Sequence, residues 1–204
     1  RQRQMCIRDR ICTAISEESR ERGVLVCFNG ELHSASEVTK KNSMALNAFS
    51  TPNFGPIGIV DNNRVIFYRN NPKVKSIQVE KINKDVALIK CVAGSDSRFL
   101  DFIIESDFKG IVIEALGRGN VPYNMVDGIK RAIKNNIPVV IVSRCLEGRV
   151  FESYGYEGGG KELKELGCIF GDVLTGQKAR IKLLVAVNYT ESINEIKDIF
   201  EIGL

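Results

Sequence analysis

Residues 86–92 (VALIKCV), 110–116 (GIVIEAL) and 138–142 (PVVIV) decide the fold class. Each is a short, nearly continuous apolar run rich in Val or Ile, which is typical of a strand buried on both faces. The stretches between them, residues 97–105 and 122–135, place apolar side chains on one face of a helix. Strands and helices that alternate in this order predict a parallel sheet covered by helices. The sequence therefore predicts the α/β class.

The sequence beyond the third strand predicts further helices. Residues 161–166 predict a short helix that ends at Gly167, and residues 176–188 predict a long one. Ser192 and Glu195 have the spacing of a capping box, which predicts the start of a last helix. These helices supply layers that cover the faces of the predicted sheet.

The sequence before residue 70 is less regular. Residues 11–20 predict a helix, followed by a buried parallel strand at 23–28 (GVLVCF) that ends at the turn Asn29-Gly30. Residues 30–70 are interpreted as a long irregular stretch. Because one helix and one parallel strand cannot bury each other, we expect this part to be the tail of a larger domain. The strand at 23–28 is then expected to have lost its sheet neighbours.

These patterns divide the chain into four segments. Residues 1–10 (RQRQMCIRDR) lack apolar periodicity and are interpreted as a non-native leader. Residues 11–70 are interpreted as the C-terminal remnant of an N-terminal domain, and residues 71–85 as a polar linker. Residues 86–204 are expected to form a small, complete α/β domain.

Charge and hydropathy exclude several classes of protein. The formal net charge is +4, and most of it lies in residues 1–10, which hold four Arg and one Asp. The remainder is close to neutral and therefore lacks the basic face of a nucleic-acid-binding domain. No apolar run reaches the length of a membrane span.

The cysteines and the single histidine restrict the chemistry. The six cysteines are far apart and form no CxxC pair, which is typical of reduced core thiols in a reducing compartment. One histidine, His33, excludes a His-based zinc cluster and argues against a serine–histidine hydrolase. Cys145 follows the third strand and is interpreted as a structural thiol, because no histidine is available to activate it.

Two polar residues are candidates for a site. Asn120 ends the run 117–120 (GRGN) after the second strand, where open α/β sheets bind ligands, and its amide offers a donor and an acceptor. The alternative is a helix-capping turn without a ligand. Lys40 is a candidate base, because a lysine in a partly dry site deprotonates a hydroxyl nucleophile; the alternative is a solvated surface lysine. Residues 154–160 (YGYEGGG) are interpreted as a lid, a subunit contact or a plain connection.

Several blocks of the sequence, taken in order, resemble bacterial-type L-asparaginases. The blocks are residues 22–31 (RGVLVCFNGE), 33–43 (HSASEVTKKNS), 47–58 (NAFSTPNFGPIG), 110–122 (GIVIEALGRGNVP), 137–148 (IPVVIVSRCLEG) and 171–185 (GDVLTGQKARIKLLV). The resemblance covers about residues 11–204 and is greatest to the cytoplasmic type. It implies a larger N-terminal α/β domain, a linker and a smaller flavodoxin-like C-terminal domain.

The resemblance also implies an activity. Members of this family hydrolyse L-asparagine to L-aspartate and ammonia through an acyl-enzyme on a threonine, as homodimers or homotetramers. No metal, organic cofactor, nucleic acid or membrane is implied, and the implied location is cytoplasmic. Lys40 matches the lysine of the family's threonine–lysine–aspartate triad. Asn120 matches an asparagine that one subunit offers to the active site of another.

The sequence departs from the family at its nucleophiles. The family's Thr-Gly-Gly-Thr turn and Thr-Asp pair do not occur among the residues of this chain. We therefore expect the chain to be the C-terminal portion of an L-asparaginase and to be inactive alone, because acyl transfer requires a nucleophile as well as a base. Two alternatives remain: the amidase subunit of the tRNA-dependent glutamine-forming amidotransferase, and a non-catalytic asparaginase-like interaction protein.

Overall fold

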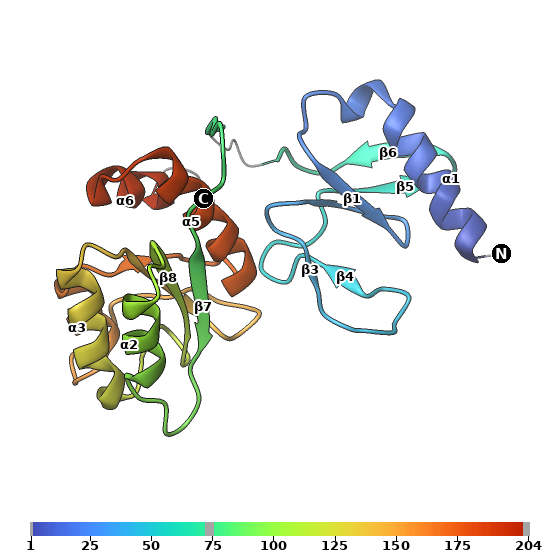
Figure 1. Ribbon diagram of the computed structural model, residues 1–204. Helices are drawn as coiled ribbons and strands as arrows, with labels where there is room; N and C mark the ends of the chain where they lie inside the picture. Colours follow the sequence, from blue (N-terminus) through green and yellow to red (C-terminus); the bar gives the residue numbers. More distant parts are fainter. Residues whose placement is uncertain (1, 72–75, 202–204) are drawn as a thin grey trace. The chain divides into compact units, whose positions relative to one another are not determined.

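The computed structural model describes residues 2–71 and 76–201, with side chains from residue 6 onward. The chain divides into two compact units, residues 1–73 and 74–204 (Figure 1). Of the expected linker at 71–85, residues 72–75 lie outside the described residues, and residues 76–85 contain no helix or strand.

The second unit is built on a parallel sheet, as the sequence predicts. Its strands lie in the order β10-β9-β8-β7. They are β7 (Val86–Lys90), β8 (Gly110–Ala115), β9 (Val139–Ser143) and β10 (Ile169–Phe170). The first three confirm the predicted strands, and the prediction missed only β10, which is too short to show a pattern.

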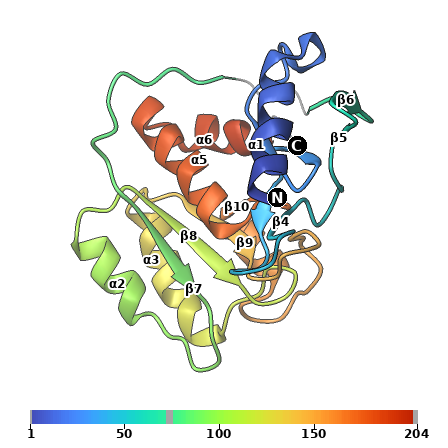
Figure 2. The ribbon, with the colours of Figure 1, turned by 90° about the vertical axis from the view of Figure 1, so that its right-hand side faces the viewer.

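Helices cover both faces of this sheet (Figures 1 and 2). They are α2 (Arg98–Glu105), the 3-10 turn η2 (Tyr123–Met125), α3 (Val126–Lys134), α4 (Gly160–Glu165), α5 (Gly176–Tyr189) and α6 (Ile193–Glu201). The predicted cap of the last helix is confirmed, because the Glu195 N–H donates to Ser192 Oγ at 3.4 Å. No helix among the described residues has the length and apolar content needed to cross a bilayer.

Alternation along the strands divides the second unit's core into two layers. On β8, Ile111 and Ile113 face α2 and α3, whereas Val112 faces α5 and α6. All three side chains are fully buried. The mixed α/β class with a helix-covered parallel sheet is thus confirmed for this unit.

The first unit differs from the prediction, because its main sheet is antiparallel. The strand order is β1-β2-β5-β6, beside a separate two-stranded ribbon of β3 and β4. The strands are β1 (Leu25–Phe28), β2 (Glu31–Ser34), β3 (Thr39–Lys40), β4 (Phe49–Ser50), β5 (Gly58–Asp61) and β6 (Arg64–Phe67). The expected parallel strand and the expected irregular stretch at 30–70 are therefore both wrong.

Two tight turns explain the difference. Asn29 and Gly30 join β1 to β2 with φ of 53° and 76°, and Asn62 and Asn63 join β5 to β6 with φ of 46° and 65°. Two consecutive residues with positive φ form the turn whose twist matches an antiparallel hairpin, and Asn and Gly adopt that conformation most readily. The turns fold each strand back onto its neighbour.

Helix α1 (Gln2–Ile15) begins earlier than predicted and is followed by the 3-10 turn η1 (Glu17–Ser19). The expected leader at 1–10 therefore overlaps a helix. Polar contacts attach this helix to the sheet, since Arg8 Nε donates to Asn63 Oδ1 and Arg10 Nε donates to the Cys27 carbonyl, the latter at 3.2 Å. Such contacts leave no apolar periodicity in the sequence, which is why the prediction missed them.

Strand β1 lies at the edge of its sheet. It pairs with β2 in the register Leu25↔Ser34 to Phe28↔Glu31, and no described strand pairs with its other edge. All four residues of β1 are only half-buried. The expectation that this strand has lost its sheet neighbours is wrong on the β2 side, where four residue pairs join the two strands.

Candidate active site

Asn120 lies in a tight loop at the carboxyl end of β8. Gly117 and Gly119 have φ of 50° and 110°, which lets the chain reverse direction directly after the strand. The reversal is closed by two hydrogen bonds, from Leu116 N–H to the Asn120 carbonyl at 2.8 Å and from Asn120 N–H to the Leu116 carbonyl at 3.0 Å. The backbone of Asn120 is therefore held in one place.

The side chain of Asn120 contacts the glycine-rich loop at 154–160. Asn120 Oδ1 accepts a hydrogen bond from the Gly160 N–H at 3.2 Å. Next to it, the Val121 N–H donates to the Gly158 carbonyl at 2.9 Å. The loop is thus attached to the GRGN turn by backbone and side chain, so it is an ordered support for Asn120.

The neighbouring strand β9 ends in a second ordered turn. Ser143 Oγ donates to the Gly117 carbonyl at 2.7 Å and accepts from the Cys145 N–H at 3.0 Å. Arg144 Nη1 donates to the Cys91 carbonyl at 3.3 Å. These bonds join the ends of β7, β8 and β9 around the GRGN turn.

The cysteines agree only in part with the prediction of core thiols. All six are free. Burial raises the pKa of Cys91 to about 11 and that of Cys168 to about 12, so both remain neutral thiols in the core. Cys145 is exposed, so it is not one of the predicted core thiols. It lies two residues beyond the end of β9, and the apolar residues of that strand end at Val142.

Lys40, the other predicted site residue, belongs to the first unit. It is exposed at the end of β3 and pairs with Phe49 across the ribbon. Its Nζ lies 5.9 Å from the centroid of the Phe49 ring, and that ring packs edge-on against Phe28 with the centroids 5.2 Å apart. Lys40 and Asn120 therefore lie in separate units, and each unit holds one predicted residue.

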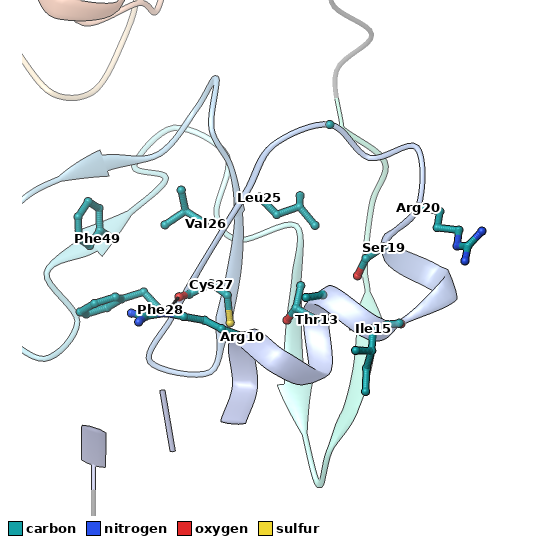
Figure 3. Close-up of a pocket in the computed structure, with 13 residues that line it drawn as sticks. Arg10, Thr13, Ile15, Ser19, Arg20, Leu25, Val26, Cys27, Phe28 and Phe49 are labelled. Carbon is teal, nitrogen blue, oxygen red and sulfur yellow. Dashed lines mark hydrogen bonds between the residues drawn. The ribbon is translucent and has the colours of Figure 1, made fainter. Parts of the chain in front are cut away.

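A pocket of about 720 Å³ lies next to this ribbon, between α1 and the open side of β1. Thr13, Cys27 and Phe49 are among the residues that line it (Figure 3). Thr13 Oγ1 donates to the Asp9 carbonyl at 2.8 Å, and burial is the main cause that raises the pKa of Cys27. Neither group is activated as a nucleophile, so the pocket offers a mainly apolar surface rather than a reactive centre.

His33 is buried on β2 in a polar network that no sequence pattern predicts. Its Nδ1 lies 3.0 Å from Thr51 Oγ1, and its Nε2 lies 3.3 Å from Glu31 Oε2. Burial lowers the pKa of His33 more than the adjacent Glu31 raises it. Glu31 is partly exposed, so water screens the charge that would raise this pKa. His33 is then neutral near pH 7 and ties β2 to the loop that contains Thr51.

The sequence contains a signal for one of the two contacts that the prediction lacks, the packing of the loop at 158–160, but none for the contact between His33 and Thr51. Three consecutive glycines, Gly158, Gly159 and Gly160, indicate a backbone that approaches other groups closely. No local pattern links His33 to Thr51, which is 18 residues away along the chain. Among residues 2–71 and 76–201, no group of His, Cys, Asp and Glu side chains has the arrangement of a metal site.

Two family models match the chain in succession. The model described as "Asparaginase, N-terminal" matches residues 4–73, and the model described as "Glutaminase/Asparaginase C-terminal domain" matches residues 85–200. The second match alone covers more than half of the chain.

Curated relatives fall into two named groups. An L-asparaginase of Bacillus licheniformis is 33% identical over 93% of this chain and 59% of that protein. A glutamyl-tRNA(Gln) amidotransferase subunit of Pyrococcus abyssi is 29% identical over 92% of this chain and 45% of that protein. A probable periplasmic L-asparaginase of Haemophilus influenzae is 29% identical over 94% of this chain and 55% of that protein. The chain thus spans about half the length of the relatives it matches.

Proposed function

Because this chain belongs to the asparaginase family, we propose that it is part of an L-asparaginase, an amidohydrolase that converts L-asparagine to L-aspartate and ammonia. The observation that carries the proposal is the ordered match to both asparaginase domains, at 4–73 and 85–200. The presence of Lys40 and Asn120 in sequence blocks that resemble the family supports it.

In the proposed reaction, a threonine hydroxyl attacks the side-chain amide carbon of the substrate. A neutral lysine takes the hydroxyl proton, the C–N bond breaks, and ammonia leaves with a proton. Water then hydrolyses the resulting ester to release L-aspartate. The threonine motifs of the family do not occur in this chain, so we propose that the nucleophile is supplied by a segment outside these 204 residues.

Lys40 is the proposed base. An ammonium group has no lone pair, so Lys40 acts as a base only where surrounding groups exclude water from it. In the described structure Lys40 is exposed, with the Phe49 ring as its main apolar neighbour. We infer that the segment with the nucleophile also covers Lys40. Activity then requires both that segment and the first unit of this chain.

Asn120 is the proposed contribution of the second unit. It lies at the carboxyl ends of the parallel strands, where α/β sheets bind ligands, and its side chain is held by the Gly160 N–H. We propose that it reaches the substrate in another subunit of a homodimer or homotetramer. The proposal predicts that activity falls when the oligomer dissociates.

Ammonia release tests the proposed function. The full-length protein is expected to release ammonia from L-asparagine, and the 204-residue chain alone is expected to release none. Lys40→Ala in the full-length protein should abolish turnover, whereas Lys41→Ala, a change at the adjacent exposed lysine, should leave it close to wild type. Full-length protein that hydrolyses neither asparagine nor glutamine would refute the proposal.

The amidotransferase relatives favour a second candidate function. The glutamyl-tRNA(Gln) amidotransferase subunits of Pyrococcus abyssi, Methanobrevibacter smithii and Pyrococcus horikoshii are 28–30% identical to this chain, which is close to the values for the asparaginases. In that case the full-length protein would release ammonia from glutamine, and a partner protein with Glu-tRNA(Gln) would stimulate it. Asparagine hydrolysis without any partner excludes this candidate.

The proposed location is the cytoplasm. All six cysteines are free, which suits a reducing compartment. The Haemophilus influenzae relative is named as periplasmic, so fractionation of the source cells is the direct check. Recovery of the protein with periplasmic markers would overturn this location.

A further inference from the structure

Helix α2 carries two aromatic side chains that the second unit leaves in solvent. Phe99 is 72% exposed and Phe102 is 63% exposed, whereas Leu100 between them is fully buried. The two rings are three residues apart, so they share one face of the helix, the aromatic face. Exposed aromatic side chains grouped in this way mark a surface at which another protein binds.

The aromatic face of α2 lies on the side away from α3. Arg131 Nη2 on α3 donates to Asp101 Oδ1 at 2.6 Å. A Cβ on Gly128 of α3 would come 2.8 Å from Leu100 Cδ1. Asp101 and Leu100 therefore mark the side that α3 covers, and at about 100° per residue the two aromatic rings lie on the other side. Because α3 contacts β9 and α2 lies next to α3 (Figure 1), the aromatic face lies toward the edge of the sheet that β7 forms.

The outer edge of β7 is open. The Cys91 N–H donates to the Glu114 carbonyl at 2.9 Å, so the odd-numbered residues of this segment direct their backbone groups toward β8. Leu88 and Lys90 therefore direct their backbone groups outward, where no strand among the described residues pairs with them. Such an edge pairs with another strand when one is available.

We propose that a second copy of this chain docks on this surface, with the two α2 helices antiparallel and the two β7 strands side by side. Paired strands lie about 4.8 Å apart and packed helices about 8–10 Å apart, so one two-fold axis serves both contacts. Leu88 and Lys90 then exchange backbone hydrogen bonds with Lys90 and Leu88 of the other copy. The two aromatic faces meet on one side of the joined sheet.

The charges at the two ends of the aromatic face favour this partner. Arg98 and Glu105 are exposed and lie two turns apart on α2, one at each end of the helix. An antiparallel pair brings each Arg98 next to Glu105 of the other copy, so both charge pairs are complementary. Arg98 Nε donates to Asp96 at 2.9 Å, which leaves the Nη groups for the second contact.

Sedimentation of the 204-residue chain tests whether the aromatic face is an interface. One helix face and one strand edge form a small interface, so we expect a dimer with Kd of about 1–100 μM. Phe102→Ser should raise Kd at least about tenfold, whereas Ile181→Ser, at an exposed residue of α5, should leave it within about twofold. Urea unfolding of the second unit checks that each variant is folded. A wild-type chain that is monomeric at about 1 mM, or a Kd unaffected by Phe102→Ser, would overturn the proposal.

A charge exchange tests the antiparallel arrangement. Arg98→Glu alone and Glu105→Arg alone each place like charges opposite one another, so each should raise Kd about tenfold at low salt and less at high salt. A mixture of the two variants should associate with a Kd close to wild type, because both charge pairs are again opposite in sign. A mixture that associates no better than either variant would overturn the antiparallel arrangement.

Hydrogen exchange tests the strand contact. The amides of Leu88 and Lys90 should exchange about tenfold more slowly at concentrations well above Kd than well below it. The Ile89 amide, which faces β8, is the internal control and should not change. Rates at Leu88 and Lys90 that do not depend on concentration would overturn the strand contact. None of these measurements involves a substrate, so they are independent of the proposed function.

Discussion

The two sheets of the molecule differ in how fully they are covered. In the second unit, every residue of β9 and all but one of β8 are buried between α2 and α3 on one face and α5 and α6 on the other. In the first unit, β1 is half-buried along its length, and β6 alternates between exposed and half-buried residues. Both sheets have hydrogen-bonded neighbours, so the contrast lies in side-chain burial and in the open edge of β1.

The two units therefore differ in their proposed roles, since one holds Asn120 in place and the other carries the proposed base, Lys40. The well-covered sheet places Asn120 on a turn whose backbone and side-chain bonds are all made within its own unit. The less covered unit carries Lys40, whose proposed role needs water to be excluded by groups that the described residues do not provide. We infer that the second unit is a preformed scaffold and that the first becomes a reactive site only in a larger assembly.

The largest expected effect of a single substitution lies in the second unit. Leu183 on α5 is fully buried against β8, where a Cβ on Gly110 would come 2.9 Å from Leu183 Cδ2. Leu183→Ala should lower the free energy of unfolding by about 3 kcal/mol, because it removes apolar contacts and leaves a cavity. Ile181→Ala, on the exposed face of the same helix, is the control and should cost less than about 0.5 kcal/mol. Urea unfolding followed by NMR signals of this unit measures both, and equal losses would contradict the two-layer core.

A substitution in β1 should have a smaller effect. Val26 is half-buried at the sheet edge opposite His33. Val26→Ala should lower the free energy of unfolding of the first unit by about 1 kcal/mol, because only part of the side chain is removed from water on folding. The same urea experiment, read from NMR signals of the first unit, measures it. A loss as large as that of Leu183→Ala would show that β1 is as well covered as β8.

Mild acid should weaken only the first unit through histidine, since His33 is the single histidine of the chain. Burial lowers the pKa of His33 in the folded state, so the unfolded chain binds the proton more readily. Its stabilising effect is therefore complete above about pH 6.5, the usual histidine value, and declines as the pH falls toward the lowered pKa. Unfolding of the first unit at pH 7 and pH 5 measures this, and His33→Gln should abolish that part of the pH dependence. A first unit that gains stability on acidification would contradict the neutral form.

Prediction from sequence succeeded where the pattern is local and strong. The strands at 86–90, 110–115 and 139–143 are continuous apolar runs, and the last helix has its Ser192 cap, so the second unit follows from short-range rules. The first unit failed because its strands are short and only partly buried, so apolar periodicity is weak. The dipeptide Asn29-Gly30 is interpreted only as the end of a strand, although Asn-Gly is also a strong signal for a two-residue hairpin.

The sequence was enough to name the residues of the candidate site, but it did not predict which residues contact them in the fold. Lys40 and Asn120 could be named from the motifs in which they lie. The bond from Gly160 to Asn120 joins residues 40 apart, and the contact between His33 and Thr51 joins residues 18 apart. Such pairs are made by tertiary packing, which leaves no periodic signal in one sequence.

Hydrogen exchange across the whole chain tests the contrast between the units most directly. The amides of Val112 and Ile113, on a strand with neighbours on both sides, should exchange at least about a hundredfold more slowly than those of Leu25 and Cys27 on β1. That result would show that the sheet of the second unit is well protected, whereas the edge strand β1 of the first unit is not. Equal and strong protection of β1 and β8 in the 204-residue chain would contradict the account, because it would mean that the first unit is already fully covered.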